Sequence, residues 1–151
     1  MADRFRIRAA AEADLEQVAA IERDVFSDPW SARSFLPLLK PDALVAEAGG
    51  RIVGYLFSRS AADEAEVLNL AVAPEYRRAG LGRRLLETVI DRWKTRGLKR
   101  VYLEVRASNE PAQAFYQALG FGPSGVRRGY YSRPPEDALV LTRSLQSEGR
   151  E

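Results

Sequence analysis

Apolar residues change their spacing several times along the chain, and each change predicts a new element. An apolar/polar alternation at residues 5–7 predicts a short opening strand. From about Glu12 the apolar residues recur at helical spacing, and Asp28-Pro29 predicts the end of that helix because a residue before proline avoids helical backbone. Ser31 then predicts the N-cap of a second short helix that runs to Leu39.

The middle of the chain predicts three consecutive strands. Apolar runs at residues 44–46 and 52–57 are joined by Gly49-Gly50, a pair suited to the positive φ angles of a tight hairpin turn. A third strand is expected over residues 65–72, and Pro74 ends it. Three antiparallel strands in sequence form a meander.

The second half predicts a crossover unit and then a hairpin. Apolar residues between Leu81 and Trp93 mark one face of a long helix, which Gly97 ends. The remaining elements are a strand over 101–105, a helix over 112–119 capped by Gly120, and strands over 121–129 and 137–145 around Arg133-Pro134-Pro135. The order β-α-α-β-β-β-α-β-α-β-β predicts an α/β fold of the α+β type, with a mixed sheet and one β-α-β crossover.

Length and composition limit the classes of protein to which the chain can belong. A chain of 151 residues has the size of one domain, so we expect a single domain over residues 1–151 with a frayed polar tail at 146–151. With 46% hydrophobic and 29% charged residues, the composition is typical of globular proteins. Apolar runs fall well short of the roughly 20 residues that span a bilayer, and no signal-peptide pattern opens the chain. We therefore expect a cytoplasmic protein with no membrane partner.

The residue types that are missing limit the chemistry. The chain has no cysteine and no histidine, which excludes disulfides, thiolate nucleophiles and Cys-based zinc sites. A general base must then be a carboxylate, a tyrosine, a lysine or water, and we expect no metal. The net charge of +2 is too weak to predict nucleic-acid binding. Arginine and lysine are nevertheless concentrated at residues 77–100, which favours an anionic ligand. Acidic residues, by contrast, outnumber basic ones among the first thirty residues of the chain.

The stretch from residue 68 to 86 carries the most chemical information. A buried strand runs through a turn with Gly80 and Gly82 into the start of the long helix. Unpaired N–H groups and the dipole at such a helix start attract anions, and glycines let a phosphate approach the backbone, so pyrophosphate is a natural ligand. The GK[ST] ending of a Walker loop and the GxGxxG pattern are both absent. The alternative is that these glycines only shape the turn and that the arginines only solvate it.

The spacing Arg77-x-x-Gly80-x-Gly82 resembles the [RQ]-x-x-G-x-[GA] signature of the GNAT acetyltransferases, and it lies between a strand and a long helix as that family requires. Further stretches resemble the RimI-type subgroup, which acetylates the N-terminal alanine of a ribosomal protein. They are Asp28-Pro29-Trp30-Ser31, Asn69-Leu70-Ala71-Val72, LEVRASN at 103–109, YQALGF at 116–121, RRGYY at 127–131 and Glu136-Asp137-Ala138. Pro134-Pro135 departs from the pattern in the loop expected on the substrate side.

This resemblance implies the GNAT fold, in which a mostly antiparallel central sheet is flanked by helices and a β-α-β core binds acetyl-CoA, the cosubstrate. The residues expected to bind acetyl-CoA are Leu70, Ala71 and Val72 beside the pantetheine arm, Arg77, Arg78, Ala79, Gly80, Leu81, Gly82 and Arg83 around the pyrophosphate, and Asn109. Asn109 also precedes Glu110-Pro111 as a good helix N-cap, so it could serve both roles.

The same resemblance makes Glu104 the general base and Tyr116 the proton donor to the departing thiolate. Glu104 lies in an apolar strand, where a carboxylate is costly unless it faces a cleft. On alternation alone, Glu104 could instead lie on the solvent face and pair with an arginine. Phe115-Tyr116 could likewise be ordinary core aromatics.

Four residues are candidates for contacting the protein substrate. Tyr130 and Tyr131 could form one wall of a peptide site, and the loop from Phe26 to Trp30 the other. Glu22, with its acidic neighbours on the first helix, could attract a basic N-terminal tail. The alternatives are a C-terminal hairpin packed on the core and exposed helix charges without a specific role.

The expected function is transfer of the acetyl group of acetyl-CoA to a protein's N-terminal α-amine, that of the N-terminal alanine of a small-subunit ribosomal protein. The expected partner is that protein N-terminus, with no nucleic acid and with a monomer or weak dimer as the working form. One alternative is a GNAT enzyme that acts on lysine side chains or on a small-molecule amine. The others are a non-catalytic acetyl-CoA sensor and an RNA-binding module, the latter disfavoured because the basic stretch lacks interleaved aromatics.

Overall fold

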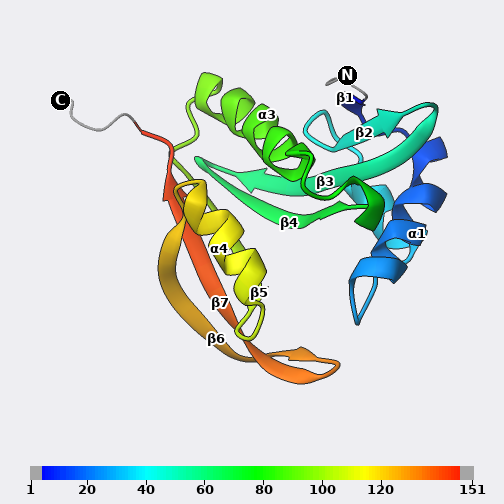
Figure 1. The fold of residues 1–151 in the computed structure, drawn as a ribbon. Coiled ribbons are helices and arrows are strands. Elements are labelled where there is room, and N and C mark those ends of the chain that lie inside the picture. Colours follow the sequence, from blue (N-terminus) through cyan, green and yellow to red (C-terminus); the bar gives the residue numbers. More distant parts are fainter. Residues whose placement is uncertain (1–4, 147–151) are drawn as a thin grey trace. The chain divides into compact units, whose positions relative to one another are not determined.

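The computed structural model describes residues 5–146 (Figure 1). The predicted frayed tail comprises residues 146–151. Of these, residues 147–151 lie outside the described residues. The strands are β1 (Arg6–Ala9), β2 (Leu44–Ala48), β3 (Arg51–Ala61), β4 (Glu64–Val72), β5 (Arg100–Arg106), β6 (Gly122–Ser132) and β7 (Pro135–Ser144). The α-helices are α1 (Leu15–Val25), α2 (Ala32–Phe35), α3 (Leu81–Thr95) and α4 (Glu110–Ala118), with 3₁₀ turns η1 (Glu12–Asp14), η2 (Leu36–Leu38) and η3 (Pro74–Tyr76).

The predicted order of helices and strands is confirmed, but helix boundaries differ from the prediction. The second helix, expected to run to Leu39, is α-helical only to Phe35 and continues as the 3₁₀ turn η2. Helix α1 ends at Val25, three residues before Asp28-Pro29, because Phe26 already has extended backbone with φ −110° and ψ 146°. Ser31 occupies the N-cap position of α2, but its side chain makes no capping hydrogen bond. Its hydroxyl lies 3.3 Å from that of Ser34 instead.

The strands form one seven-stranded sheet in the order β1-β2-β3-β4-β5-β7-β6. The pairs β1/β2, β2/β3, β5/β7 and β6/β7 are antiparallel, whereas β4 and β5 are parallel and have α3 between them in the sequence. Gly49 and Gly50 have φ angles of 57° and 80°, which confirms the predicted hairpin turn. The mixed, mostly antiparallel sheet with one β-α-β crossover is therefore as predicted.

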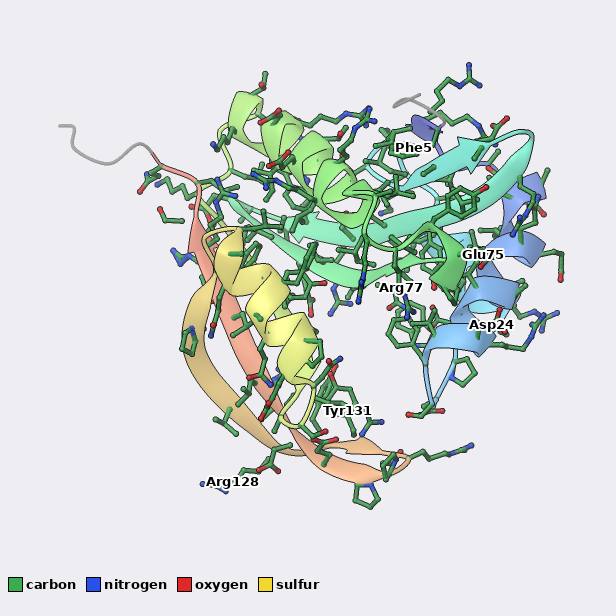
Figure 2. All side chains as sticks on the ribbon, in the orientation of Figure 1. Phe5, Asp24, Glu75, Arg77, Arg128 and Tyr131 are labelled. Atoms are coloured by element: carbon green, nitrogen blue, oxygen red, sulfur yellow. The ribbon has the colours of Figure 1, made fainter. Side chains whose placement is uncertain are left out.

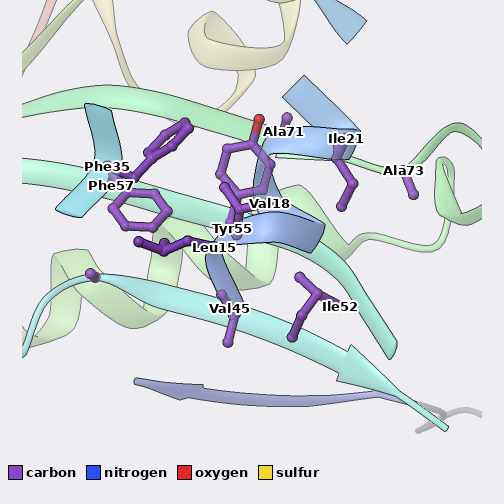
Figure 3. Close-up of a cluster of buried hydrophobic side chains, with 11 residues drawn as sticks. Leu15, Val18, Ile21, Phe35, Val45, Ile52, Tyr55, Phe57, Ala71 and Ala73 are labelled. Atoms are coloured by element: carbon purple, nitrogen blue, oxygen red, sulfur yellow. The ribbon is translucent and has the colours of Figure 1, made fainter. Parts of the chain in front are cut away.

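The chain divides into two compact units. The first comprises Met1–Arg59 and Leu68–Val89. Its apolar cluster joins one face of α1 to α2 and the central strands, and Figure 3 shows Phe35, Tyr55 and Phe57 among the aliphatic side chains. The Phe35 ring centroid lies 4.7 Å from that of Phe57 and 5.9 Å from that of Tyr55. Each such buried aromatic contributes about 1.5–3 kcal/mol of hydrophobic stabilisation.

Gly54 lets α3 approach the sheet closely within the first unit. A Cβ atom at this position would lie 3.2 Å from the Ala71 carbonyl oxygen, 3.3 Å from Leu81 and 3.4 Å from Leu85. A larger side chain would push the first turn of the helix outward. Gly54 therefore helps to fix the start of α3 against β3 and β4.

The second unit comprises Ser60–Val67 and Ile90–Glu151. In it, α4 lies along β5 and β7 (Figure 1), and Arg143 of β7 donates a 3.0 Å hydrogen bond to the Leu119 carbonyl at the end of the helix. Burial alternates strictly along β5, with the odd-numbered residues 101–105 buried. The even-numbered residues Tyr102, Glu104 and Arg106 share the other, half-buried face.

Among the helices of residues 5–146, none combines the length and the apolarity that crossing a bilayer needs.

Candidate active site

The predicted pyrophosphate turn lies in the first unit between η3 and α3. Arg78 and Gly80 have φ angles of 69° and 76°, and the Arg84 N–H bonds the Gly80 carbonyl at 3.1 Å to begin the helix. The first N–H groups of an α-helix have no partner within the helix, and they face the end where anions are stabilised. Figure 2 shows Arg77 in this turn. The local backbone therefore suits an anionic ligand.

The side chains of this turn differ in their environment. Residues 77–80 are exposed, and nothing lies within 4 Å of a Cβ placed on Gly80. Leu81 is 1% exposed, so its side chain belongs to the core and only its backbone remains for a ligand. Arg83 pairs with Glu87 at 2.9 Å one helical turn further on. Ala71 in β4 is buried, and its neighbours Leu70 and Val72 are half-buried.

Glu22 is buried, contrary to the expectation of an exposed helix charge. Its carboxylate accepts hydrogen bonds from the Tyr55 hydroxyl at 2.5 Å, from the Asn69 amide at 2.9 Å and from the Trp30 N–H at 3.1 Å. The residue is only 1% exposed, so its charge is stabilised by these donors rather than by water. Asp24, two residues after Glu22 and on another face of α1, remains exposed (Figure 2).

Trp30 occupies the loop after α1 that was predicted as a substrate wall. Its side chain is half-buried, and its ring lies 5.3 Å from that of Phe35. The loop is held at one end by the Trp30–Glu22 hydrogen bond, whereas Phe26 at its start is 37% exposed. The loop thus presents one aromatic side chain to solvent and packs another on the core.

Glu104 lies in the second unit on the half-buried face of β5. Its side chain is 8% exposed, and Oε2 lies 3.0 Å from Nη1 of Arg127. The Tyr130 hydroxyl also donates a hydrogen bond to this carboxylate. The arginine partner of the alternative interpretation is therefore present, but the carboxylate does not lie on the solvent face.

A bulge in β6 explains how Arg127 and Tyr130 both reach Glu104. Four residue steps along β6, from Arg127 to Tyr131, face only two steps along β7. Within the bulge Gly129 has a φ angle of 61°, and its N–H donates a 2.8 Å hydrogen bond to Asp137. In a regular strand, residues three apart point to opposite faces, so the extra residues allow this convergence.

Tyr131 is held beside Tyr130 by a second group of contacts. Its ring lies 5.0 Å from that of Tyr130, and the Arg106 guanidinium lies 4.2 Å above it. Arg106 also pairs with Glu136 at 3.2 Å and donates to the carbonyls of the hairpin turn at Arg133 and Pro134. Burial, followed by the neighbouring Tyr130, raises the pKa of Tyr131 to about 12. Burial and the hydrogen bond to Glu104 raise the pKa of Tyr130.

Tyr116 is a buried aromatic with a titratable group. It is 8% exposed, and its ring lies 5.1 Å from Phe115 and 5.6 Å from Phe121. Burial raises the pKa of its phenol, and the nearby Tyr131 raises it further. The Tyr116 ring therefore packs in the core and its hydroxyl stays protonated at neutral pH, whereas its role as proton donor stays a prediction.

Asn109 caps α4, as predicted. Its Oδ1 accepts a 3.1 Å hydrogen bond from the Ala112 N–H, and Pro111 lies in the first turn. A contact between Asn109 and a coenzyme stays a prediction.

Sequence reasoning missed the arginines that support the candidate residues. Arg106 and Arg127 lie within the quoted LEVRASN and RRGYY stretches, but periodicity gave them no role. The position of Glu22 had a signal: it lies on the helical stripe of Leu15, Val18 and Val25, where a buried carboxylate implies polar partners.

Comparison with known proteins identifies the family. The Acetyltransferase (GNAT) family model matches residues 15–121. The chain belongs to the GNAT acetyltransferase family. This acetyltransferase is 39% identical over 132 residues to the putative [ribosomal protein bS18]-alanine N-acetyltransferase of Bacillus subtilis, with 85% of this chain and 87% of the relative covered. It is 37% identical over 146 residues to N-alpha-acetyltransferase RimI of Mycobacterium tuberculosis, covering 91% and 90% of the two chains.

Solved structures agree with this assignment. The crystal structure of the ribosomal-protein-S18-alanine N-acetyltransferase from Escherichia coli superposes with a TM-score of 0.86 at 34% identity, covering 97% of each chain. The predicted GNAT fold and N-acetyltransferase class are thus confirmed, and the acetyl donor of the family is acetyl-CoA.

Proposed function

We propose that this enzyme acetylates the α-amine of the N-terminal alanine of a small-subunit ribosomal protein. The observation that carries the proposal is the enclosed Glu104 carboxylate beside Tyr130, in a chain similar along most of its length to enzymes named for this activity. The proposed enzyme is a single GNAT domain over residues 1–151. A ribosomal substrate implies a cytoplasmic enzyme, which needs no nucleic acid or membrane and works as a monomer or weak dimer.

Acetyl-CoA binding is proposed for the turn before α3 and for β4, and Asn109 is a further proposed contact. The exposed turn with Arg77, Arg78, Ala79 and Gly80, and the backbone of residues 81–83, bind the pyrophosphate. The pantetheine arm runs beside Leu70, Ala71 and Val72 of β4. Arg83 takes part with its backbone, since its guanidinium pairs with Glu87. The chemistry requires no metal.

Proton transfer in the proposed reaction begins at Glu104. An α-amine has a pKa of about 8, so much of it arrives as ammonium at neutral pH. Glu104 takes a proton from this ammonium, and the amine nitrogen attacks the thioester carbonyl carbon. Collapse of the tetrahedral adduct breaks the carbon–sulfur bond, the nitrogen loses its second proton to solvent, and CoA leaves as thiolate.

Tyr116 acts as the acid at the leaving sulfur. A CoA thiol has a pKa of about 8.5 and a free phenol about 10, so proton transfer from Tyr116 is uphill, more so because burial raises its pKa. The hydroxyl therefore stabilises the sulfur by donating a hydrogen bond. The phenol proton moves fully to the sulfur only when the phenol regains a proton from solvent or from the protonated Glu104.

Four residues are proposed to take part in substrate recognition. Tyr130, with a 48% exposed ring, and Tyr131 contact the first residues of the peptide. Trp30 contacts the substrate from the loop after α1. Glu22 contributes through its hydrogen bond to the Trp30 backbone, because its buried carboxylate is closed to a substrate chain.

The test is CoA release with peptides that copy the N-terminus of the ribosomal target. We expect turnover with a free α-amine and none when the amine is blocked, even if the peptide contains an internal lysine. Turnover of the blocked, lysine-bearing peptide would reassign the enzyme to lysine side chains. Turnover of small amines alone would make a small-molecule amine the substrate. No turnover of any amine would indicate a non-catalytic acetyl-CoA sensor.

A further inference from the structure

The ion pair between Arg127 and Glu104 is asymmetric. The two side chains meet at 3.0 Å, but the guanidinium side chain is 57% exposed whereas the carboxylate side chain is 8% exposed. Exposed guanidinium groups remain hydrated, so they gain little from such a contact and leave it easily. An enclosed carboxylate, by contrast, is costly to leave without a partner.

Arg127 occupies surroundings that suit any cation. Its guanidinium lies 5.3 Å from the centroid of the Tyr130 ring, and the Tyr130 hydroxyl donates to the same carboxylate. A carboxylate beside an aromatic ring also suits an ammonium group. The cation that Arg127 offers to Glu104 is thus of the same kind as the protonated α-amine of a peptide.

We propose that Arg127 is an internal competitor of the substrate, which occupies the position of the α-ammonium on Glu104 and leaves when a peptide binds. The proposal rests on the proposed function, because it takes Glu104 as the group that receives the α-amine.

The exchange has a chemical consequence. A guanidinium stays protonated in proteins, so Arg127 cannot give a proton to Glu104. An α-ammonium can, and becomes a nucleophile when it does. The resting pair therefore keeps the carboxylate satisfied without starting proton transfer, and the arriving substrate replaces a cation that cannot react with one that can.

Steady-state kinetics of Arg127→Gln test the proposal. Removing the competitor should lower the KM for a free α-amine peptide about three- to tenfold and leave the KM for acetyl-CoA unchanged, since an exposed ion pair is weak. Arg128→Gln is the matched control, because Arg128 is an exposed neighbour on the same strand (Figure 2). It removes the same charge and should change the peptide KM less than twofold.

A binding measurement separates competition from general effects of the mutation. By calorimetry, Arg127→Gln should tighten binding of the free-amine peptide and leave binding of its Nα-acetylated product unchanged, because the product carries no ammonium. Equal tightening of both peptides, or a raised peptide KM, would overturn the proposal and make Arg127 a residue that orients Glu104. Failure of the proposed function would give a different result, because the wild-type enzyme itself would then not turn over α-amine peptides.

Discussion

The side-chain nitrogen of Asn69 lies 2.9 Å from both carboxylate oxygens of Glu22. The contact joins α1 to β4 immediately before Leu70, the first residue expected beside the acetyl donor. Tyr55 from β3 and the Trp30 backbone donate to the same carboxylate. Four segments of the first unit therefore depend on one buried acid.

Glu22→Ala should destabilise the protein by about 2–4 kcal/mol, because it leaves the buried donors of Tyr55 and Asn69 unsatisfied as well as opening a cavity. Urea unfolding followed by circular dichroism measures this difference. Asp24→Ala, an exposed change on the same helix, should stay within about 0.5 kcal/mol of wild type. Equal effects of the two substitutions would show that the Glu22 hydrogen bonds do not stabilise the fold.

Gly80→Ala should raise the KM for acetyl-CoA roughly tenfold. Gly80 has a φ angle of 76°, which costs alanine about 1–2 kcal/mol, and relief of that strain would move the N–H groups expected to bind pyrophosphate. Gly97→Ala is a matched control at the other end of α3, with a φ angle of 82° and equally open surroundings. It should reduce stability by a similar amount without changing the acetyl-CoA KM. A raised KM in both variants would argue against a pyrophosphate site at Gly80.

The Arg8–Asp14 contact makes stability depend on acid pH. Two 2.9 Å hydrogen bonds from the Arg8 guanidinium, aided by the Ala11 N–H, lower the pKa of Asp14 below its ordinary 3.8. A carboxyl with a lowered folded-state pKa adds stability above its unfolded pKa and loses it as the pH falls through the folded value.

Asp14→Asn should accordingly be less stable than wild type at pH 7, by about 1–2 kcal/mol, and this stability difference should narrow as the pH falls below the carboxyl's ordinary pKa of 3.8. Urea midpoints measured across this range check the sign. Arg8→Gln removes the same contact from the other side and should flatten the acid dependence similarly. If the stability difference between Asp14→Asn and wild type stayed constant with pH, the Arg8–Asp14 ion pair would not be its cause.

Gly54→Val should destabilise the protein by about 1–3 kcal/mol, since a Cβ there already lies 3.2–3.4 Å from Ala71, Leu81 and Leu85. Gly122→Ala, where nothing lies within 4 Å of the new Cβ, is the control and should change the melting temperature little. If Gly54→Val had the same melting temperature as Gly122→Ala, the start of α3 would have to be held by other contacts.

Local rules predicted the features whose physics is local. Gly49-Gly50 required positive φ angles, Asn109 required a helix to cap, and the strand–turn–helix around Gly80 followed from chain order alone. The β6 bulge was not predicted, because its register depends on pairing with β7. The burial of Glu22 was missed for a related reason, since Tyr55 and Asn69 approach it from 33 and 47 residues away.

Tyr116→Phe should lower kcat about 10²-fold and change the peptide KM by less than about threefold, because it removes only the hydroxyl proposed to stabilise the leaving sulfur. The ring keeps its packing against Phe115 and Phe121, so thermal stability should be nearly unchanged. Tyr102→Phe is a matched control: it removes a half-buried phenol from β5 that has no assigned role in the reaction, and should leave kcat near the wild-type value. Full kcat in Tyr116→Phe would reduce Tyr116 to a core aromatic and leave protonation of the thiolate to solvent.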